Sequence, residues 1–112
     1  MKIEDSEFKN CNFNEGILPI DINEGSSSSN IMIENTTFKN NTGYNGSILN
    51  INELDENSSI LINDSMFDNN KALNYGGVLY SSSRLSDLYV FFNDCKFKNN
   101  KSVKGTIVIY HL

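Results

Sequence analysis

Acidic and amide residues recur along the chain at steps of about 30 residues, and they are its first candidates for chemistry. Asp5, Asp64 and Asp94 recur in this way, with Asn35 in the second place. Carboxylates can ligate Ca²⁺, and two facing carboxylates such as Asp64 and Asp94 can hydrolyse a glycosidic bond. Asp and Asn also tolerate left-handed backbone corners. We favour the corner role, so the sequence predicts no catalytic residue, no cofactor and no metal site.

The other reactive side chains are isolated from one another. His111 has no Cys or Ser partner in register, so we expect it to be a structural bystander. Cys11 and Cys95 lie three repeats apart, roughly 14 Å at about 4.8 Å per repeat, whereas a disulfide needs Cα atoms within about 7 Å. The sequence therefore predicts two free thiols, with Cys95 in a column of small side chains.

The composition limits the function classes that are open. The 112 residues fit one domain, and 9 Lys+Arg against 14 Asp+Glu give a net charge of −5. This charge has the wrong sign for binding nucleic acid, and no apolar run is long enough to span a membrane. Residues 1–5 lack the apolar core of a signal peptide, so we expect any targeting segment outside this fragment. The 7 Phe and 5 Tyr, with many Ile, favour strands.

An internal repeat organises nearly the whole chain. One segment begins with an apolar residue and ends in Phe-x-Asn, and its copies are separated by steps of 30, 29 and 30 residues. These copies are residues 3–10, 33–40, 62–69 and 92–99. We divide residues 1–112 into one domain with repeats at about 1–30, 31–59, 60–89 and 90–112. Such a period indicates a solenoid.

Within each repeat, apolar and polar residues alternate as in strands, without a helical period. A single repeat cannot bury its apolar face, but stacked repeats can. The sequence therefore predicts an all-β fold, a right-handed parallel β-helix of about four turns, here called rungs, of 29–30 residues each. At about 4.8 Å per rung, the coil would be roughly 19 Å long.

Stacked rungs place equivalent residues in columns. One column, Phe8, Phe38, Phe67 and Phe97, predicts an internal aromatic stack. Another column contains Asn in every repeat, and an amide side chain has both donors and an acceptor with which to bond one rung to the next. We therefore predict an internal asparagine ladder at Asn10, Asn40, Asn69 and Asn99.

The third repeat, with Phe67, Asn70 and then Gly76-Gly77-Val78, resembles the repeat of chlamydial polymorphic outer-membrane proteins, Phe-x-x-Asn followed by Gly-Gly-Ala-Ile. In its Asn-, Ser- and Ile-rich background, the pattern is also similar to the repeat arrays of the large scaffoldin of anaerobic gut fungi, which collects dockerin-bearing enzymes into cellulosomes. The resemblance covers about residues 1–110. It implies a β-helix at an extracellular or cell-surface location and, in its scaffoldin form, a cohesin-like module.

Surface residues suggest a protein-binding role. Tyr44 and Tyr75 precede glycines in adjacent repeats, and apolar residues interrupt otherwise polar connectors. Aromatic residues outside a core are typical anchors for a partner, although these residues could instead pack on neighbouring rungs. The candidate partner-binding residues are Tyr44, Tyr75, Leu54, Asp55, Arg84, Leu85, Asp87, Leu88 and Tyr89.

The resulting hypothesis is a non-catalytic extracellular scaffold module that binds a protein, such as the dockerins of plant-cell-wall-degrading enzymes. Two alternatives stay open. One is a carbohydrate-active β-helix, either pectate-lyase-like or sugar-binding, and the other is a passenger repeat of an adhesin or autotransporter. The first and last rungs would have unpaired edge strands, so end-to-end self-association is also expected.

Overall fold

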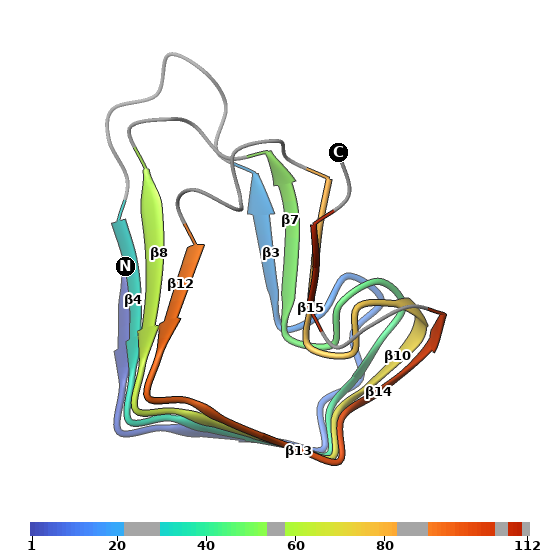
Figure 1. The fold of residues 1–112 in the computed structure, drawn as a ribbon, viewed down its shortest axis with the longest axis horizontal. Helices are drawn as coiled ribbons and strands as arrows, with labels where there is room; N and C mark the ends of the chain where they lie inside the picture. The colour runs from blue at the N-terminus through green and yellow to red at the C-terminus, as the bar shows by residue number, and fades with distance from the viewer. Residues whose placement is uncertain (22–29, 54–57, 83–89, 105–107, 111–112) are drawn as a thin grey trace.

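The computed structural model describes residues 1–21, 30–53, 58–82, 90–104 and 108–110. Strands in these ranges form four parallel sheets, which we call sheets A to D (Figure 1). Sheet A contains β1 (Lys2–Glu4), β4 (Asn30–Glu34), β8 (Ser59–Asn63) and β12 (Val90–Asn93). Sheet B contains β2 (Glu7–Lys9), β5 (Thr37–Lys39), β9 (Met66–Asp68) and β13 (Lys96–Lys98). Sheet C contains β6 (Thr42–Gly43), β10 (Lys71–Tyr75) and β14 (Lys101–Lys104). Sheet D contains β3 (Leu18–Asp21), β7 (Leu49–Glu53), β11 (Leu79–Ser81) and β15 (Val108–Tyr110).

The chain visits the sheets in the order A, B, C and D in each rung, except that in the first rung an isolated bridge from Asn12 to Thr42 takes the place of a sheet C strand. Figure 1 looks down the coil, where the four rungs lie over one another. The register follows the repeat: Ile3 pairs with Ile33, Ile33 with Ile62, and Ile62 with Phe92. The shortest extent of the molecule is 21 Å, close to the length expected for four stacked rungs. The prediction of an all-β, parallel β-helical fold with about four rungs is confirmed.

Two corners of every rung adopt the left-handed backbone conformation. The first joins sheet A to sheet B and is occupied by Asp5, Asn35, Asp64 and Asp94, with φ between 46° and 51°. The second joins sheet B to sheet C and is occupied by Asn10, Asn40, Asn69 and Asn99, with φ between 55° and 58°. Because Asn and Asp adopt positive φ more readily than other non-glycine residues, both residue columns are explained by the corners.

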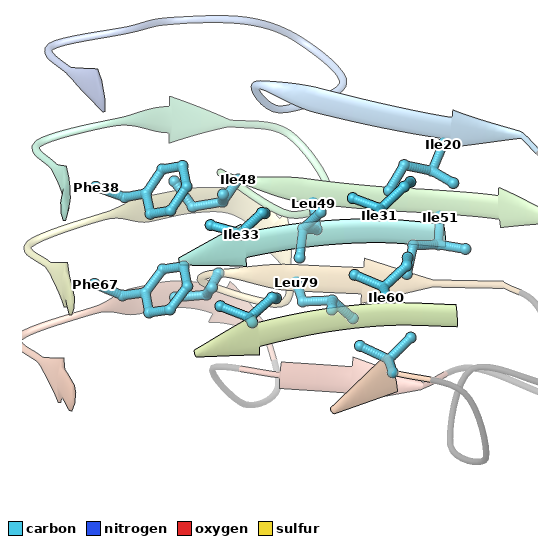
Figure 2. Close-up of a cluster of buried hydrophobic side chains, with 13 residues drawn as sticks. Ile20, Ile31, Ile33, Phe38, Ile48, Leu49, Ile51, Ile60, Phe67 and Leu79 are labelled. Carbon is cyan, nitrogen blue, oxygen red and sulfur yellow. The ribbon is translucent and has the colours of Figure 1, made fainter. Parts of the chain in front are cut away.

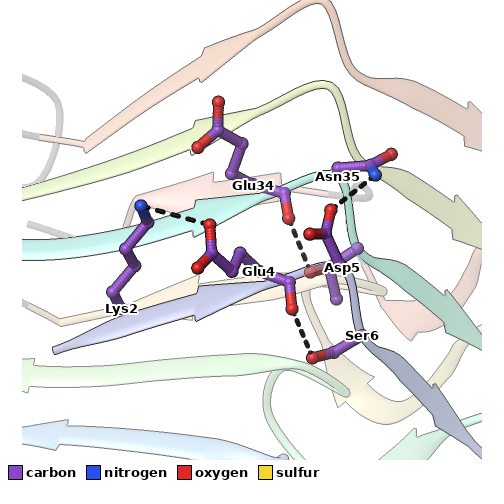
Figure 3. A network of polar contacts seen from close by, with 7 residues as sticks. Lys2, Glu4, Asp5, Ser6, Glu34 and Asn35 are labelled. Atoms are coloured by element: carbon purple, nitrogen blue, oxygen red, sulfur yellow. Dashed lines mark hydrogen bonds and ion pairs between the residues drawn. The ribbon is translucent and has the colours of Figure 1, made fainter.

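Figure 3 shows the first of these corners. The Asp5 backbone N–H donates to the Glu34 carbonyl across 3.1 Å, and Nδ2 of Asn35 donates to Oδ1 of Asp5 across 2.7 Å. Lys2 lies 3.1 Å from a Glu4 carboxylate oxygen, and this hydrogen bond to Glu4 raises the pKa of Lys2. The corner therefore bonds one rung to the next through both backbone and side chain.

The core lies between sheets A, B and D and consists of stacked apolar columns (Figure 2). The Phe rings of sheet B stack nearly parallel, with centroid separations of 5.2 Å for Phe8–Phe38, 5.1 Å for Phe38–Phe67 and 5.0 Å for Phe67–Phe97. Phe38 and Phe67 are fully buried. The Phe column therefore forms one continuous stack that is buried at its centre, and stacking of this kind adds to the stabilisation from burial.

The third corner, before sheet D, depends on glycine. Gly46 has φ 72°, and a Cβ at this position would collide with the Leu49 carbonyl oxygen. Gly16 and Gly76 occupy the same corner with φ 77° and 65°. The recurring glycine of the repeat is therefore required both by its backbone conformation and by close packing.

Among the described residues, no helix is long and apolar enough to cross a membrane. Cys11 and Cys95 are both free, as the sequence predicts.

Candidate binding surface

A ladder of asparagine side chains runs through the interior at the corner between sheets B and C. Nδ2 of Asn41 donates to Oδ1 of Asn70, and Nδ2 of Asn70 donates to Oδ1 of Asn100, each across 3.0 Å. The same oxygens also accept backbone N–H groups, from Asn41 at 3.0 Å and from Asn70 at 2.9 Å. Asn41 and Asn70 are 1% and 0% exposed. Each amide therefore satisfies backbone groups that would otherwise be buried without a partner.

The predicted ladder column lies one residue earlier, on the outside of the corner. Asn10, Asn69 and Asn99 are exposed and Asn40 is partly buried. This column also contains a rung-to-rung bond, from Nδ2 of Asn69 to Oδ1 of Asn40 across 2.7 Å. The asparagine ladder is confirmed as a feature of the fold, but its interior members are Asn41, Asn70 and Asn100. In the first rung Cys11 holds the interior position, where its backbone N–H donates to Oδ1 of Asn41 across 2.9 Å.

A second column, of small polar side chains, follows the first corner. Ser6, Thr36 and Ser65 each donate a hydroxyl hydrogen bond to the backbone carbonyl two residues earlier, at 2.7 to 2.9 Å. Cys95 takes the same place in the fourth rung, with Sγ 3.4 Å from the Asn93 carbonyl oxygen. Burial raises the pKa of the Cys95 thiol. Cys95 therefore acts as a small residue in this column, as predicted.

The carboxylates that could have formed a catalytic or Ca²⁺ site are distributed along the first corner. Asp5, Asp64 and Asp94 are exposed, and Asp5 accepts a hydrogen bond from Asn35. In the part of the chain that the structure describes, no three His, Cys, Asp or Glu side chains come together as metal ligands. Arg84, the one arginine of the sequence, lies outside the described residues.

Exposed apolar side chains gather on the outer face of sheet C. Along β10, Lys71, Leu73 and Tyr75 point outward while Ala72 is buried. Leu73 is 50% exposed and Tyr75 37%. We define the sheet C face as these outward residues together with their register neighbours Tyr44, Lys101, Val103 and Lys104.

The register brings the members of the sheet C face together. Asn12 bridges to Thr42, Thr42 pairs with Lys71, and Lys71 pairs with Lys101. Two places after this column, on the same side of the strands, lie the apolar residues Tyr44 (48% exposed), Leu73 (50%) and Val103 (63%). Large exposed apolar patches on soluble proteins commonly mark interaction sites.

Tyr75 is held in place within the face. Its ring lies 6.2 Å from the Tyr80 ring, at an interplanar angle of 22°. Nζ of Lys104 lies 6.0 Å from the centre of the Tyr75 ring, a distance at which a cation is attracted to an aromatic face. The three lysines give this face a positive charge, although the whole chain is acidic.

The structure brings together only part of the predicted binding set. Tyr44 and Tyr75 both lie on the sheet C face and are exposed. The other candidates lie outside the described residues: Leu54, Asp55, Arg84, Leu85, Asp87, Leu88 and Tyr89. Sequence reasoning missed Leu73 and Val103. Lys71, Leu73 and Tyr75 alternate along the sequence, and this alternation could have indicated that they share the outward face of one strand.

Comparison with known proteins gives one match. The model of the Chlamydia polymorphic membrane protein repeat matches residues 64–82. No curated protein and no solved structure matches the chain. The matched stretch contains β9, β10 and β11, with the corner Asn69, the ladder residue Asn70 and the outward residues Leu73 and Tyr75. The repeat is that of an outer-membrane protein family, which agrees with the chlamydial resemblance. The scaffoldin resemblance has no support from these comparisons.

Proposed function

We propose that this chain is a non-catalytic, surface-exposed β-helical module that binds a protein partner, in the manner of an adhesin or autotransporter passenger. The sheet C face is its binding surface. The observation that carries the proposal is the concentration of exposed Tyr44, Leu73, Tyr75 and Val103 on one face of the coil. The repeat match supports the surface location, because it names a membrane protein family.

The chemistry of the face favours a protein segment over a sugar. Sugar recognition by Tyr uses an open ring face, but the ring of Tyr75 already packs with Tyr80 and Lys104. Leu73 and Val103 offer aliphatic contacts that suit apolar side chains. Lys71, Lys101 and Lys104 add charge complementary to acidic residues. The partner is therefore expected to present apolar and acidic side chains together.

A selection from phage-displayed random peptides tests this proposal with the folded chain as bait. We expect enrichment of peptides that combine Asp or Glu with apolar residues. Binding of these peptides should fall at least about tenfold in the triple variant Tyr44→Ser, Leu73→Ser, Val103→Ser, since a buried apolar contact contributes about 1 to 2 kcal/mol. A double variant at exposed apolar residues of other sheets, Met66→Ser and Phe91→Ser, is the matched control and should bind normally.

Two results would contradict the proposal. One is enrichment of peptides that bind the triple variant as well as the wild type. The other is binding to polysaccharides on a glycan array, or cleavage of polygalacturonate in the presence of Ca²⁺, which would favour the carbohydrate-active alternative. Purified dockerin domains can be tested in the same assay, although no observation on this chain favours them.

A further inference from the structure

We propose that the partner of the sheet C face is the outer side of sheet A in a second copy of this β-helix, with the two coils side by side and parallel. This inference rests on the proposed function, because it names the partner of the same binding surface. The contact uses the sides of the coil, so it applies to a coil of any number of rungs.

Sheet A has an apolar column on its outer side. Met32 and Leu61 are partly exposed at the centres of strands whose neighbouring residues are buried, and Phe91, in register with Leu61, is 47% exposed. In the first rung this place is taken by Lys2, whose charge pairs with the Glu4 carboxylate. We define the sheet A face as this column and the outward column two residues later, which contains Glu4, Glu34, Asn63 and Asn93.

The two faces adjoin corners of opposite charge. Six acidic residues and one lysine lie within two positions of the left-handed residues at the corner between sheets A and B. Five lysines and one aspartate lie within two positions of those at the corner between sheets B and C. Asp64 and Asp94 directly follow the sheet A face and are exposed, whereas the exposed Lys71 and Lys101 begin strands of sheet C. Contact between sheets A and C therefore sets opposite charges together, whereas contact between two C sheets would set lysines together.

The columns of the two faces match in order. On sheet A, the apolar column comes first and the acidic corner follows it. On sheet C, the column of Thr42, Lys71 and Lys101 comes first, and the apolar column lies two residues later, with Tyr44, Leu73 and Val103. When the strands of the two faces run in opposite directions, apolar side chains therefore face apolar side chains and acids face lysines.

This arrangement also fixes the direction of the two coils. In a coil of fixed handedness, the strand direction and the outward direction together determine the direction in which the rungs advance. Two faces with opposed strands and opposed outward directions therefore belong to parallel coils. In the fourth rung, Phe91 of one copy would lie against Val103 of the other, and Asn93 and Asp94 against Lys101. The third rung repeats this pattern with Leu61 against Leu73, and with Asn63 and Asp64 against Lys71.

The spacing of the columns favours a partner of the same architecture. Within each column, successive rungs are about 4.8 Å apart. Successive turns of an α-helix are about 5.4 Å apart, and alternate residues of an extended strand about 6.6 Å apart, so neither matches the columns rung for rung. A second β-helix has the same period and can pair every rung.

Each copy can use both faces at once. Figure 1 shows sheets A and C on different sides of the coil, joined by sheet B. A contact between two different surfaces of the same chain leaves one of each surface free in a pair of molecules. Side-by-side association therefore continues into a row of parallel coils.

Sedimentation velocity of the purified chain over a range of concentrations tests this proposal. We expect reversible self-association that weakens as salt is raised, because the attraction between the faces is screened. Lys101→Glu should weaken association at least about tenfold, since repulsion from Asp94 replaces attraction. The double variant Asn93→Lys, Lys101→Glu restores opposite charges across the contact and should recover association. Lys39→Glu is the matched control, because it changes the net charge equally but lies on sheet B, and it should associate like the wild type.

The apolar contact is tested separately. Phe91→Ser should weaken self-association at least about tenfold, because the ring would be buried against the second copy. Met66→Ser, at an exposed apolar residue of sheet B, is the matched control and should associate normally. Circular dichroism of each variant establishes that the coil is folded.

The proposal is overturned if the wild type remains monomeric at every concentration, or if Phe91→Ser and Met66→Ser associate equally. Peptide binding distinguishes this failure from a failure of the proposed function. A monomeric chain whose sheet C face still binds the selected peptides overturns only the second copy as partner. Peptides that bind the sheet C triple variant as well as the wild type overturn the binding surface itself.

Discussion

Asn41 and Asn70 occupy equivalent positions in adjacent rungs, and Oδ1 of Asn70 accepts two hydrogen bonds from Asn41. One comes from the side-chain Nδ2 and the other from the backbone N–H, both across 3.0 Å. Asn70 in turn donates from Nδ2 to the Phe38 carbonyl across 3.0 Å. A single buried amide thus links two rungs and pairs the backbone at the B–C corner, where the chain turns and sheet hydrogen bonding is interrupted.

Phe67 should be the most costly aromatic side chain to remove. It lies between Phe38 and Phe97 and is fully buried. Phe67→Ala leaves a cavity in the column, so we expect the free energy of unfolding to fall by about 3 to 5 kcal/mol. Urea denaturation measures this loss. Phe97→Ala removes the same group from the exposed end of the column and should cost less, and equal losses would contradict the stacked core.

Gly46→Ala should destabilise the third corner. The left-handed backbone at Gly46 disfavours a side chain, and the added Cβ would meet the Leu49 carbonyl oxygen. We expect a loss of about 2 kcal/mol or more in the free energy of unfolding, measured by the same denaturation. Lys39→Ala, at an exposed strand position, is the control. A Gly46→Ala variant as stable as the control would show that the corner has another conformation.

Cys95 should give the stability of the coil a dependence on alkaline pH. Burial raises the pKa of its thiol in the folded state, so the folded chain holds this proton more tightly than the unfolded chain does. The contribution to stability is complete below the unfolded pKa of about 8.5, and it is lost as the pH rises through the higher folded pKa.

Unfolding free energies of the wild type and Cys95→Ser, measured from pH 7 to pH 10, isolate this effect. Serine fits the column, because Ser6 and Ser65 occupy it in other rungs and bond to the same carbonyl position. We expect Cys95→Ser to be folded and to lose less stability at high pH than the wild type. Identical pH profiles for the two proteins would contradict the burial of this thiol.

The repeat period made the architecture predictable from sequence. A step of 29 or 30 residues places equivalent side chains in one column whatever the shape of each rung, so the pairing of Ile33 with Ile62 and of Phe38 with Phe67 follows directly. The corners were also predictable, because few residues other than Asn, Asp and Gly accept positive φ.

The pattern alone did not predict which of the two adjacent Asn columns lies inside the coil at the corner between sheets B and C. Asn40 and Asn41 are neighbours of the same type, as are Asn69 and Asn70. Since Cys11 interrupts the second column, the sequence favours the first as the ladder. The left-handed conformation of Asn40 instead leaves that side chain at the outer side of the corner and places Asn41 inside.

The sheet C face was only partly predictable. Its inward positions are small, with Gly43, Ala72 and Ser102 in register. Strands are usually interpreted with their apolar side chains facing the core. In sheet C the small side chains face inward and the apolar side chains face outward, so the usual interpretation fails. Tyr44 and Tyr75 were identified by their place before glycine, whereas Leu73 and Val103 resembled core residues.

The central claim is that the buried ladder holds the rungs together, and a comparison of Asn70→Leu with Asn69→Gly tests it most directly. Asn70→Leu removes the acceptor of both the backbone N–H and the side-chain Nδ2 of buried Asn41, and each buried orphan group costs about 1 to 3 kcal/mol. Asn69→Gly removes only an exposed bond at a corner that suits glycine.

The measurement is the free energy of unfolding of both variants by urea denaturation. We expect Asn70→Leu to lose about 3 kcal/mol or more, and Asn69→Gly to stay within about 1 kcal/mol of the wild type. Equal losses, or a stable Asn70→Leu variant, would contradict the account.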